Sequence, residues 1–340
     1  MVEIHSLQVN NGDCFMIVFT NCKKPIILVI DSGYVATYCT FKSKLQDLIS
    51  TYDCEVHMVL THIDLDHIGG FKCLFSNADS KILSRIKGFY YNTLESLQMF
   101  ASCMTKEMVQ SEDVITTSTK TGYGDAVTLE KYLKGKNICV YTGLRAGHTI
   151  NFCEGIQAHV LSPSPNSLEK FQNWCEEESD RKTASKPSDY DIPLAELMAK
   201  EFSSDSRPVN ASSISLLIEA LGKRLLFLGD AQPNDVESGL RSLGYSEENP
   251  VHVDFVKVSH HGSRFNTSPK LLELINSNRF LISGRGGKGH PDKETLARII
   301  YSQNQPILCF NYNIADNIFS ASDKQEFNIK IEYGTEWRLK

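Results

Sequence analysis

The chain has 340 residues, of which 41% are hydrophobic and 22% charged, which is the composition of an ordinary soluble globular protein. No stretch approaches the roughly 18 apolar residues of a membrane span, and the N-terminal segment lacks a signal-peptide pattern, so we expect a cytoplasmic protein. The net charge of -6 does not indicate nucleic-acid binding and does not exclude it, because a local basic patch or bound cations can offset it.

In the first half of the chain, apolar runs and alternating patterns predict a series of strands. Asn10-Asn11-Gly12-Asp13 has the residues expected of a turn between the first two strands. A helix is expected near 41–51, and residues 70–135 look mainly helical. The predicted strands are 3–9, 14–20, 25–31, 55–60, 138–142 and 156–161.

The second half repeats this order of strands and helices. Its predicted strands are 213–220, 224–229, 253–259, 279–283, 306–311 and 326–333, and its predicted helices are 233–243, 268–277 and 292–303. Two β-rich blocks, each followed by helices, indicate two sheets packed face to face with helices outside, in a single α/β domain over 1–340. Insertions are expected at about 88–135, which looks helical, and 164–208, which is polar and would form one or two helices or a lid.

A cluster of potential metal ligands follows the strand at 55–60. The segment Thr61-His62-Ile63-Asp64-Leu65-Asp66-His67 places four imidazole or carboxylate groups within six residues, and Gly69-Gly70 follows it. The strand fixes the loop, and the start of the next helix directs backbone N–H groups towards anionic ligands. The pattern predicts a metal site rather than a solvated acidic loop with stray histidines.

Two later strands end in residues of the same kind. The apolar run 225–229 ends at Asp230, and the run 254–259 ends at His260-His261. A carboxylate at the end of a buried strand must be paired, hydrogen-bonded or metal-bound, because its isolated burial is costly. Asp230 alone could also be the N-cap of the helix that follows, but together with the histidines it indicates a metal centre.

With these residues in place, the sequence resembles the metallo-β-lactamase superfamily, and within it the soluble hydrolase domain of bacterial competence (DNA-uptake channel) proteins. The resemblance covers about 3–310, without the transmembrane channel of the uptake protein, and it implies a four-layer αββα sandwich. The segments that carry it are His62-x-Asp64-x-Asp66-His67, Gly229-Asp230, His260-His261-Gly262-Ser263, Asn11-Gly12-Asp13, Ile30-Asp31-Ser32-Gly33, Leu161-Ser162-Pro163, Asn210-Ala211-Ser212-Ser213 and Gly289-His290-Pro291.

The resemblance also implies two adjacent metal positions that share a bridging carboxylate, Asp230. Of the two later histidines, His260 is favoured over His261 because it comes first after its strand. The implied ligands are His62 and Asp64 at the first position, and Asp66, His67 and one of the two later histidines at the second.

Two departures from the family pattern bear on the metal. Most members have histidine in place of Asp64, and many carry a further histidine where this chain has 210–213; His148, in a predicted turn, is a candidate substitute. A carboxylate in place of an imidazole makes the first position harder, which shifts its preference from zinc towards manganese or magnesium. We expect one or two divalent ions, manganese or zinc, with magnesium as an alternative.

Such a centre would activate a water for attack on a phosphodiester, with Asp66 or Asp230 accepting the proton of the water. His290 follows a glycine-rich stretch, for which the alternative is a plain flexible loop, and is expected to contact the phosphate or protonate the leaving oxygen. Further substrate contacts are expected from Ser263, Arg264, Lys288 and Asn210.

The resemblance thus predicts a metal-dependent phosphodiesterase, most simply a nuclease that acts on DNA and could serve in defence against foreign DNA. No interleaved aromatic and basic platform for single strands is evident, although Phe89-Tyr90-Tyr91 could provide stacking. Two alternatives stay open: a hydrolase of a small ester (a phosphocholine ester, a lactone or a thioester), and a metal-binding regulatory module without activity. A protein partner could supply target recognition.

Overall fold

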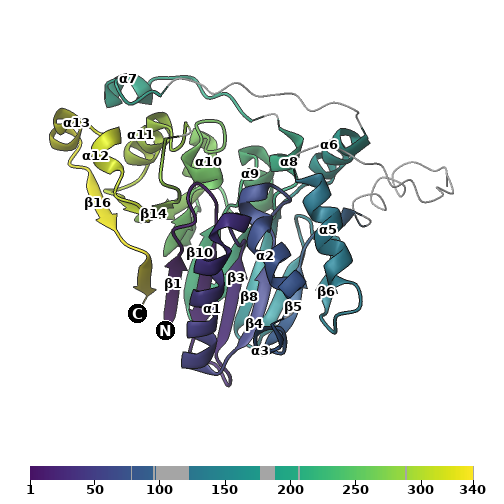
Figure 1. Ribbon diagram of the computed structural model, residues 1–340. Coiled ribbons are helices and arrows are strands. Elements are labelled where there is room, and N and C mark those ends of the chain that lie inside the picture. Colours follow the sequence, from purple (N-terminus) through teal and green to yellow (C-terminus); the bar gives the residue numbers. More distant parts are fainter. Residues whose placement is uncertain are drawn as a thin grey trace.

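Two sheets stand face to face in the computed structural model, with helices on both outer sides (Figure 1). The model describes residues 1–77, 79–94, 96, 122–176, 188–205, 207–287 and 289–339. Lys288 and parts of both expected insertions lie outside these residues. The four-layer αββα sandwich predicted from the sequence is confirmed.

The first sheet has seven strands, and the C-terminal strand of the chain joins it beside the N-terminal one. Along the sheet their order is β17 (Glu336–Leu339), β1 (Val2–Ser6), β2 (Phe15–Phe19), β3 (Ile26–Ile30), β4 (Glu55–Val59), β5 (Ile86–Tyr90) and β6 (Val140–Tyr141). The pairs from β17 to β3 are antiparallel, whereas β3, β4, β5 and β6 run parallel.

The second sheet has eight strands and contains both parallel and antiparallel pairs. Along the sheet their order is β16 (Lys330–Tyr333), β15 (Ile307–Phe310), β14 (Arg279–Ile282), β12 (Phe255–Lys257), β10 (Lys223–Phe227), β9 (Ser215–Ala220), β8 (Ile156–Ser162) and β7 (Thr149–Cys153). The strands from β16 to β10 run parallel, whereas the pairs from β10 to β7 are antiparallel. A separate pair joins β11 (Val251–Val253) to β13 (Ile275–Ser277).

Helices cover the outer face of each sheet. On the first sheet these are α1 (Tyr38–Tyr52), α2 (Leu65–Asn77), α5 (Tyr123–Leu133) and α6 (Pro165–Glu176), with the short α3 (Ser80–Leu83) and η1 (Val35–Thr37) nearby. On the second sheet they are α7 (Leu194–Met198), α9 (Pro233–Ser242), α10 (Pro269–Glu273), α11 (Lys293–Ser302) and α12 (Ala315–Ile318). The remaining elements are α8 (Pro208–Ala211), η2 (Ser259–Gly262) and α13 (Ala321–Glu326).

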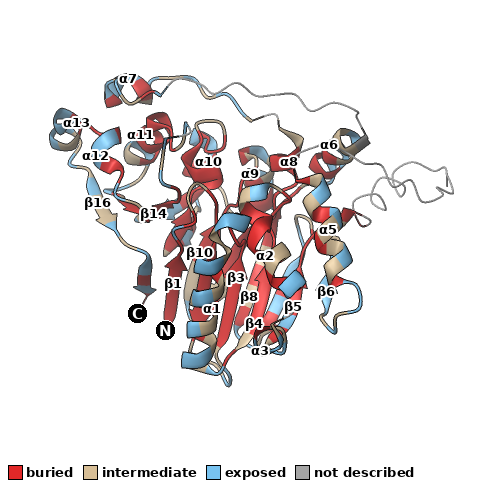
Figure 2. Cartoon of the chain, in the orientation of Figure 1, coloured by how far each residue is buried: buried red, intermediate tan, exposed pale blue. Residues whose placement is uncertain are grey.

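Side-chain alternation along the strands divides the buried residues into three apolar layers. In β2, Met16 and Val18 face the helices, whereas Phe15, Ile17 and Phe19 face the other sheet. Strands buried on both faces carry nearly continuous apolar runs, because each face packs against another layer. Figure 2 shows this burial in the strands and along the inner sides of the helices.

Several elements differ from the sequence expectation. The region 70–135, expected to be mainly helical, contains the buried strand β5 in addition to helices. The strand expected at 253–259 is two short strands, β11 and β12. The short strand β7 and the C-terminal β17 were not predicted, since β17 gains its hydrogen bonds by pairing with β1 at the far end of the chain. Among the described residues, no helix combines the length and apolar character of a membrane span.

Candidate metal centre

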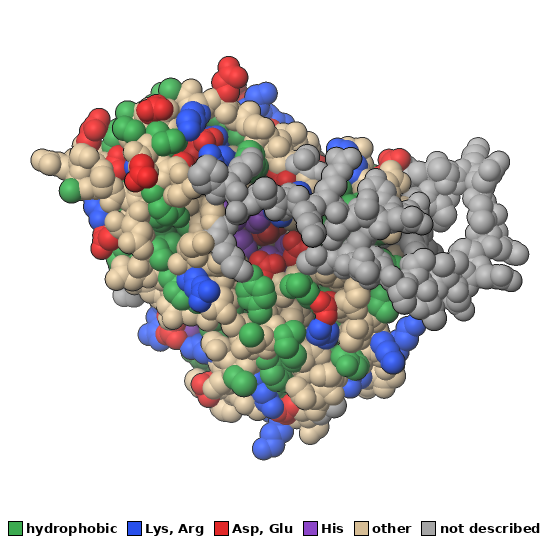
Figure 3. All heavy atoms as spheres, turned by 45° about the horizontal axis from the view of Figure 1, so that its top comes forward, with side chains coloured by type: hydrophobic (Ala, Val, Ile, Leu, Met, Phe, Trp, Pro, Cys, Tyr) green, Lys and Arg blue, Asp and Glu red, His purple; other side chains and the backbone are tan. Residues whose placement is uncertain are grey.

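The predicted ligands converge where strands of both sheets end. His62 and Asp64 lie in the loop between β4 and α2, and Asp66 and His67 lie in the first turn of α2. Asp230 follows β10, and His260 and His261 lie in η2 after β12. Because β10 and β12 run parallel, the segments that follow them leave the same edge of the sheet. Figure 3 shows histidine and acidic side chains gathered at the centre of one face.

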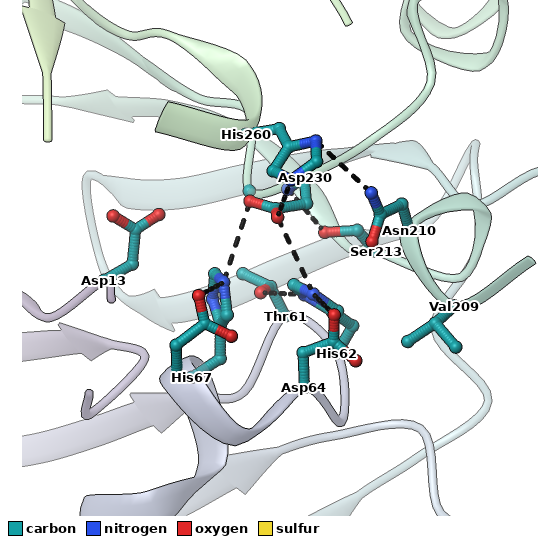
Figure 4. Close-up of polar contacts among 12 residues, drawn as sticks. Asp13, Thr61, His62, Asp64, His67, Val209, Asn210, Ser213, Asp230 and His260 are labelled. Atoms are coloured by element: carbon teal, nitrogen blue, oxygen red, sulfur yellow. Dashed lines mark hydrogen bonds and ion pairs between the residues drawn. The ribbon is translucent and has the colours of Figure 1, made fainter. Parts of the chain in front are cut away.

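Asp230 lies at the centre of this cluster, and its two carboxylate oxygens face different histidines (Figure 4). Oδ2 lies 3.9 Å from Nε2 of His62 and 3.6 Å from Nε2 of His260, whereas Oδ1 lies 3.7 Å from Nε2 of His67. Divalent ions bind nitrogen and oxygen at about 2.0–2.2 Å, so two ligands of one ion lie about 3–4 Å apart. The separations around Asp230 have this size.

The other carboxylates divide the ligands into two groups that share Asp230. In the first group, Oδ2 of Asp64 lies 3.7 Å from Nε2 of His62. In the second group, Oδ2 of Asp66 lies 3.8 Å from Nε2 of His67 and 3.5 Å from Nε2 of His261. The first group is therefore His62, Asp64, His260 and Asp230, and the second is Asp66, His67, His261 and Asp230.

His260 and His261 face different groups because of an unusual backbone. Their φ angles are 47° and 53°, in the left-handed region that residues other than glycine rarely adopt. Strained conformations of this kind persist where the surrounding structure imposes them, often at functional sites. The sequence favoured His260 beside Asp66 and His67, whereas the geometry points to His261 at that position.

A buried carboxylate orients His67. Nδ1 of His67 lies 2.8 Å from Oδ2 of Asp31, and the same oxygen accepts a hydrogen bond from the hydroxyl of Thr61 at 2.8 Å. The Thr61 hydroxyl in turn lies 3.0 Å from Nδ1 of His62. Although burial opposes the charged form, Asp31 holds the pKa of His67 well above its ordinary value. These contacts occupy the Nδ1 atoms and direct both Nε2 atoms towards Asp230.

Several buried atoms of the cluster fit a metal ion. Within the described residues, no hydrogen-bond partner meets Nε2 of His62, His67 or His261, or Oδ1 of Asp230. Buried polar atoms are almost always satisfied, so a set of unsatisfied atoms that face one another requires a partner. Imidazole and carboxylate groups are the usual ligands of zinc and manganese, so the residues present fit one or two divalent ions.

Asn266 fixes the ring of His260. Its side-chain nitrogen donates to the backbone oxygen of Asp230 at 3.1 Å, which turns its oxygen towards Nδ1 of His260 at 3.0 Å. Asn210, expected to contact substrate, instead places its side-chain nitrogen 3.3 Å from Nδ1 of the same ring. Burial lowers the pKa of His260 to about 3, which favours the neutral ring that metal binding requires.

A buried lysine and a buried aspartate border the second group; the sequence placed Asp13 in a turn and in a segment that carries the family resemblance, but indicated no role at the metal for either residue. Lys257 and Asp13 form an ion pair with side chains 1% and 0% exposed, and Lys257 donates to the backbone oxygen of Gly229 at 3.0 Å. Oδ1 of Asp13 lies 3.4 Å from Nδ1 of His261. Ligand atoms of Asp13, His67, Asp230 and His261 lie within 4.8 Å of one another, so Asp13 either supports His261 or is itself a ligand.

His290 lies at the rim of the cluster. Its ring centre is 4.8 Å from that of His260, its side chain is 31% exposed, and Nδ1 lies 3.3 Å from Oδ2 of Asp292. Burial opposes the charge of Asp292, but its contacts with His290 and Arg264 lower its pKa. The rim of the cluster therefore carries the imidazole of His290 with the carboxylate of Asp292 beside its Nδ1 atom.

Other expected substrate contacts have different surroundings. Arg264 donates from Nε to Oδ1 of Asp292 at 2.7 Å and lies near Asp189 and Glu294, which argues against a phosphate contact. Ser263 is buried, with 1% of its surface exposed. Lys288 lies outside the described residues.

The remaining sequence candidates lie apart from this cluster or within the core. His148 is exposed in the loop before β7 and belongs to neither ligand group. The residues Phe89, Tyr90 and Tyr91 are 0%, 4% and 1% exposed, so they form part of the core and not a stacking platform for bases. In the sequence, aromatic residues in a strand are compatible both with core packing and with the stacking of bases; the burial of these three residues favours core packing.

No family model matches the sequence, and no curated protein matches it. Solved structures that match include one described as MIM-2 Metallo-Beta-Lactamase, 12% identical, with 86% of this chain and 86% of that chain covered and a TM-score of 0.34. A metallo-β-lactamase from Hirschia baltica is 9% identical, with 71% of this chain and 84% of that chain covered and a TM-score of 0.31. A HARLDQ-motif mutant from Cronobacter sakazakii is 12% identical, with 66% and 61% covered and a TM-score of 0.30, so the chain spans less than two thirds of that protein. Similarities this low support no inference about activity.

Proposed function

We propose that this protein is a metal-dependent hydrolase of phosphodiesters and that its substrate is DNA. The observation that carries the proposal is the position of Asp230, whose two oxygens face two separate groups of imidazole and carboxylate ligands. A carboxylate shared in this way suits a pair of cations, and paired cations are common in enzymes that cleave phosphate esters. The motif resemblance to metallo-β-lactamase hydrolases, and to the hydrolase domain of DNA-uptake proteins, supports the same reaction class.

The chemistry divides between the bound ions and the protein side chains. Divalent ions held by these ligands would supply a water of lowered pKa and would neutralise the charge of the phosphate. Asp230 and Asp66 hold carboxylate oxygens where the attacking water would lose its proton. The burial of His62 and His67, 2% and 0% exposed, excludes bulk water from the ligand atoms.

His290 is the residue that we assign to the leaving oxygen. It lies at the open edge of the cluster beside His260, and Asp292 contacts its Nδ1 atom. A carboxylate beside one ring nitrogen orients the imidazole, and an oriented imidazole can act as a general acid. His290 would therefore donate a proton to the oxygen that departs when the phosphodiester is cleaved.

The ligand composition bears on which ion is bound. The first group contains Asp64 and the second contains Asp66, and both groups share Asp230. Carboxylate oxygens favour harder ions, so we propose manganese ahead of zinc, with magnesium as the alternative.

The test is DNA cleavage by metal-stripped protein to which manganese, magnesium or zinc is restored one at a time. Linear and circular DNA separate exonuclease from endonuclease action. Asp66→Asn and His67→Ala should abolish cleavage, whereas His148→Ala, which changes an exposed histidine outside both ligand groups, should leave it intact. If no ion restores cleavage while a small ester is hydrolysed, the nuclease proposal is wrong and the small-ester alternative takes its place.

A further inference from the structure

The segment that precedes β9 brings an arginine to the metal centre. Asp205 and Arg207 lie just before α8, and the backbone N–H of Asp205 donates to the oxygen of Phe265 at 3.0 Å. After α8, the N–H of Ile214 donates to the oxygen of Thr61, also at 3.0 Å. The segment is therefore anchored at both ends to the loops that carry the ligands.

The guanidinium of Arg207 lies against the ring of His260. Its Nη2 atom is 2.8 Å from Nε2 of His260 and 3.2 Å from Nδ1. A nitrogen at similar distances from both ring nitrogens lies over the face of the imidazole and not along the in-plane lone pair of either one. Arg207 therefore leaves Nε2 of His260, which lies 3.6 Å from Oδ2 of Asp230, open to a metal ion and places a positive charge beside it.

Arg207 keeps hydrogen-bonding capacity that other arginines near the site have lost. Within the described part of the chain, its carboxylate partner is Asp205, with Nε of Arg207 3.6 Å from Oδ1, and the arginine side chain is 41% exposed. Asp205 is itself shared, because Oδ2 accepts a hydrogen bond from Asn210 at 2.7 Å. Arg264, by contrast, is 19% exposed and lies among three carboxylates.

We propose that Arg207 binds the anionic oxygens of the substrate at the metal centre. The proposal rests on the proposed function, and it assigns to Arg207 the phosphate contact that the sequence assigned to Arg264. The guanidinium lies beside the proposed metal position without occupying the lone pair of His260 Nε2. Its planar group therefore has donors available for two oxygens of a phosphodiester, a geometry that arginine matches well.

The positive charge beside the metal position makes two predictions of opposite sign for Arg207→Met, a variant that keeps an unbranched side chain and removes the charge. Manganese should bind the metal-stripped variant more tightly than it binds the wild type, because the cation no longer meets a neighbouring positive charge. Inorganic phosphate should bind the manganese-loaded variant more weakly, by about tenfold or more, the usual effect of one charged hydrogen bond. Arg207→Lys should restore part of the phosphate affinity, and Arg241→Met, which removes an exposed arginine paired with Glu247, is the control.

Both affinities are measured by calorimetric titration, without any turnover. An unchanged phosphate affinity in Arg207→Met, or weaker binding of manganese, would overturn the assignment. A wild-type protein that binds manganese and phosphate, and depends on Arg207 for the phosphate, but cleaves no DNA would instead contradict the proposed nuclease. A manganese-loaded wild type that binds no phosphate would contradict the role of Arg207 directly.

Discussion

Nδ1 of His67 lies 2.8 Å from Oδ2 of Asp31, and the carboxylate and the imidazole are 1% and 0% exposed. In the sequence, Asp31 stands in a segment that carries the family resemblance but has no assigned role, yet it also accepts hydrogen bonds from the backbone N–H and the hydroxyl of Thr61. The buried carboxylate of Asp31 thus fixes both Thr61, at the start of the ligand motif, and the imidazole of His67, at its end.

Asp31→Asn should weaken metal binding without removing any ligand. The amide keeps an acceptor for Thr61 but loses the negative charge behind His67, which lowers the basicity of that imidazole. We expect manganese affinity to fall by about 10–100-fold in a calorimetric titration. Asp316→Asn, on a side chain 73% exposed, is the matched control. Equal affinities in wild type and Asp31→Asn would show that Asp31 has no influence on the metal.

Lys257→Met should lower the free energy of unfolding by about 3–5 kcal/mol, because it leaves the carboxylate of Asp13 buried without its cation. Both partners are essentially inaccessible to solvent. The double variant Asp13→Asn, Lys257→Met removes both charges and should recover a large part of the loss. Urea denaturation of the metal-stripped wild type, the single variants Lys257→Met and Asp13→Asn, and the double variant measures the three losses. If the two single losses simply add in the double variant, the two charges do not depend on each other.

His57 should make the protein sensitive to acid. Burial lowers its pKa from 6.5 to about 4, and the side chain packs against Tyr90 and Phe152 in the interior. Between these two pH values the unfolded chain binds a proton that the folded chain does not, so stability is complete above pH 6.5 and falls as the pH drops towards 4.

The full contribution of this shift is about 3 kcal/mol. His57→Gln cannot bind that proton, so its free energy of unfolding should decline less than that of the wild type between pH 7 and pH 4. The difference between the two proteins in the slope of unfolding free energy against pH isolates His57, because all other groups titrate in both. Parallel slopes would exclude a buried neutral His57.

The paired glycines after the ligand motif allow α2 to pack closely on the loop that follows β3. A Cβ at Gly69 would collide with the backbone of Val35 and Tyr34. We expect Gly69→Ala to destabilise the protein by about 3 kcal/mol or to displace the loop. Gly124→Ala, in α5 with open space around it, should be neutral or stabilising by up to about 1 kcal/mol. Thermal unfolding of both variants checks this, and equal melting temperatures would contradict the close packing.

The sequence predicted site residues best where a potential metal ligand closely follows an apolar strand. His62, Asp230 and His261 each occupy such a position, and the structure brings them together because the strands end at one edge of the sandwich. Their binding of a metal stays a prediction. The layered architecture followed from the same strands, since runs that are apolar on both faces must be covered on both sides.

The remaining features depend on packing that no local pattern encodes. Asp13 looks like a turn residue, Lys257 stands inside an apolar strand, and Arg207 lies in a polar stretch with many charges. Arg264 looked free to bind phosphate, but Asp292 occupies its guanidinium. Strand β17 was missed because its partner β1 is more than 330 residues away, as in the pairing of Glu3 with Arg338.

The most direct test of the central claim is the position of manganese ions in crystals of the protein grown with that ion, located from their anomalous scattering. We predict two peaks, one between His62, Asp64, His260 and Asp230, and the other between Asp66, His67, His261 and Asp230. A single peak that does not contact Asp230, or no peak in this cluster at a manganese concentration that supports DNA cleavage, would contradict the account.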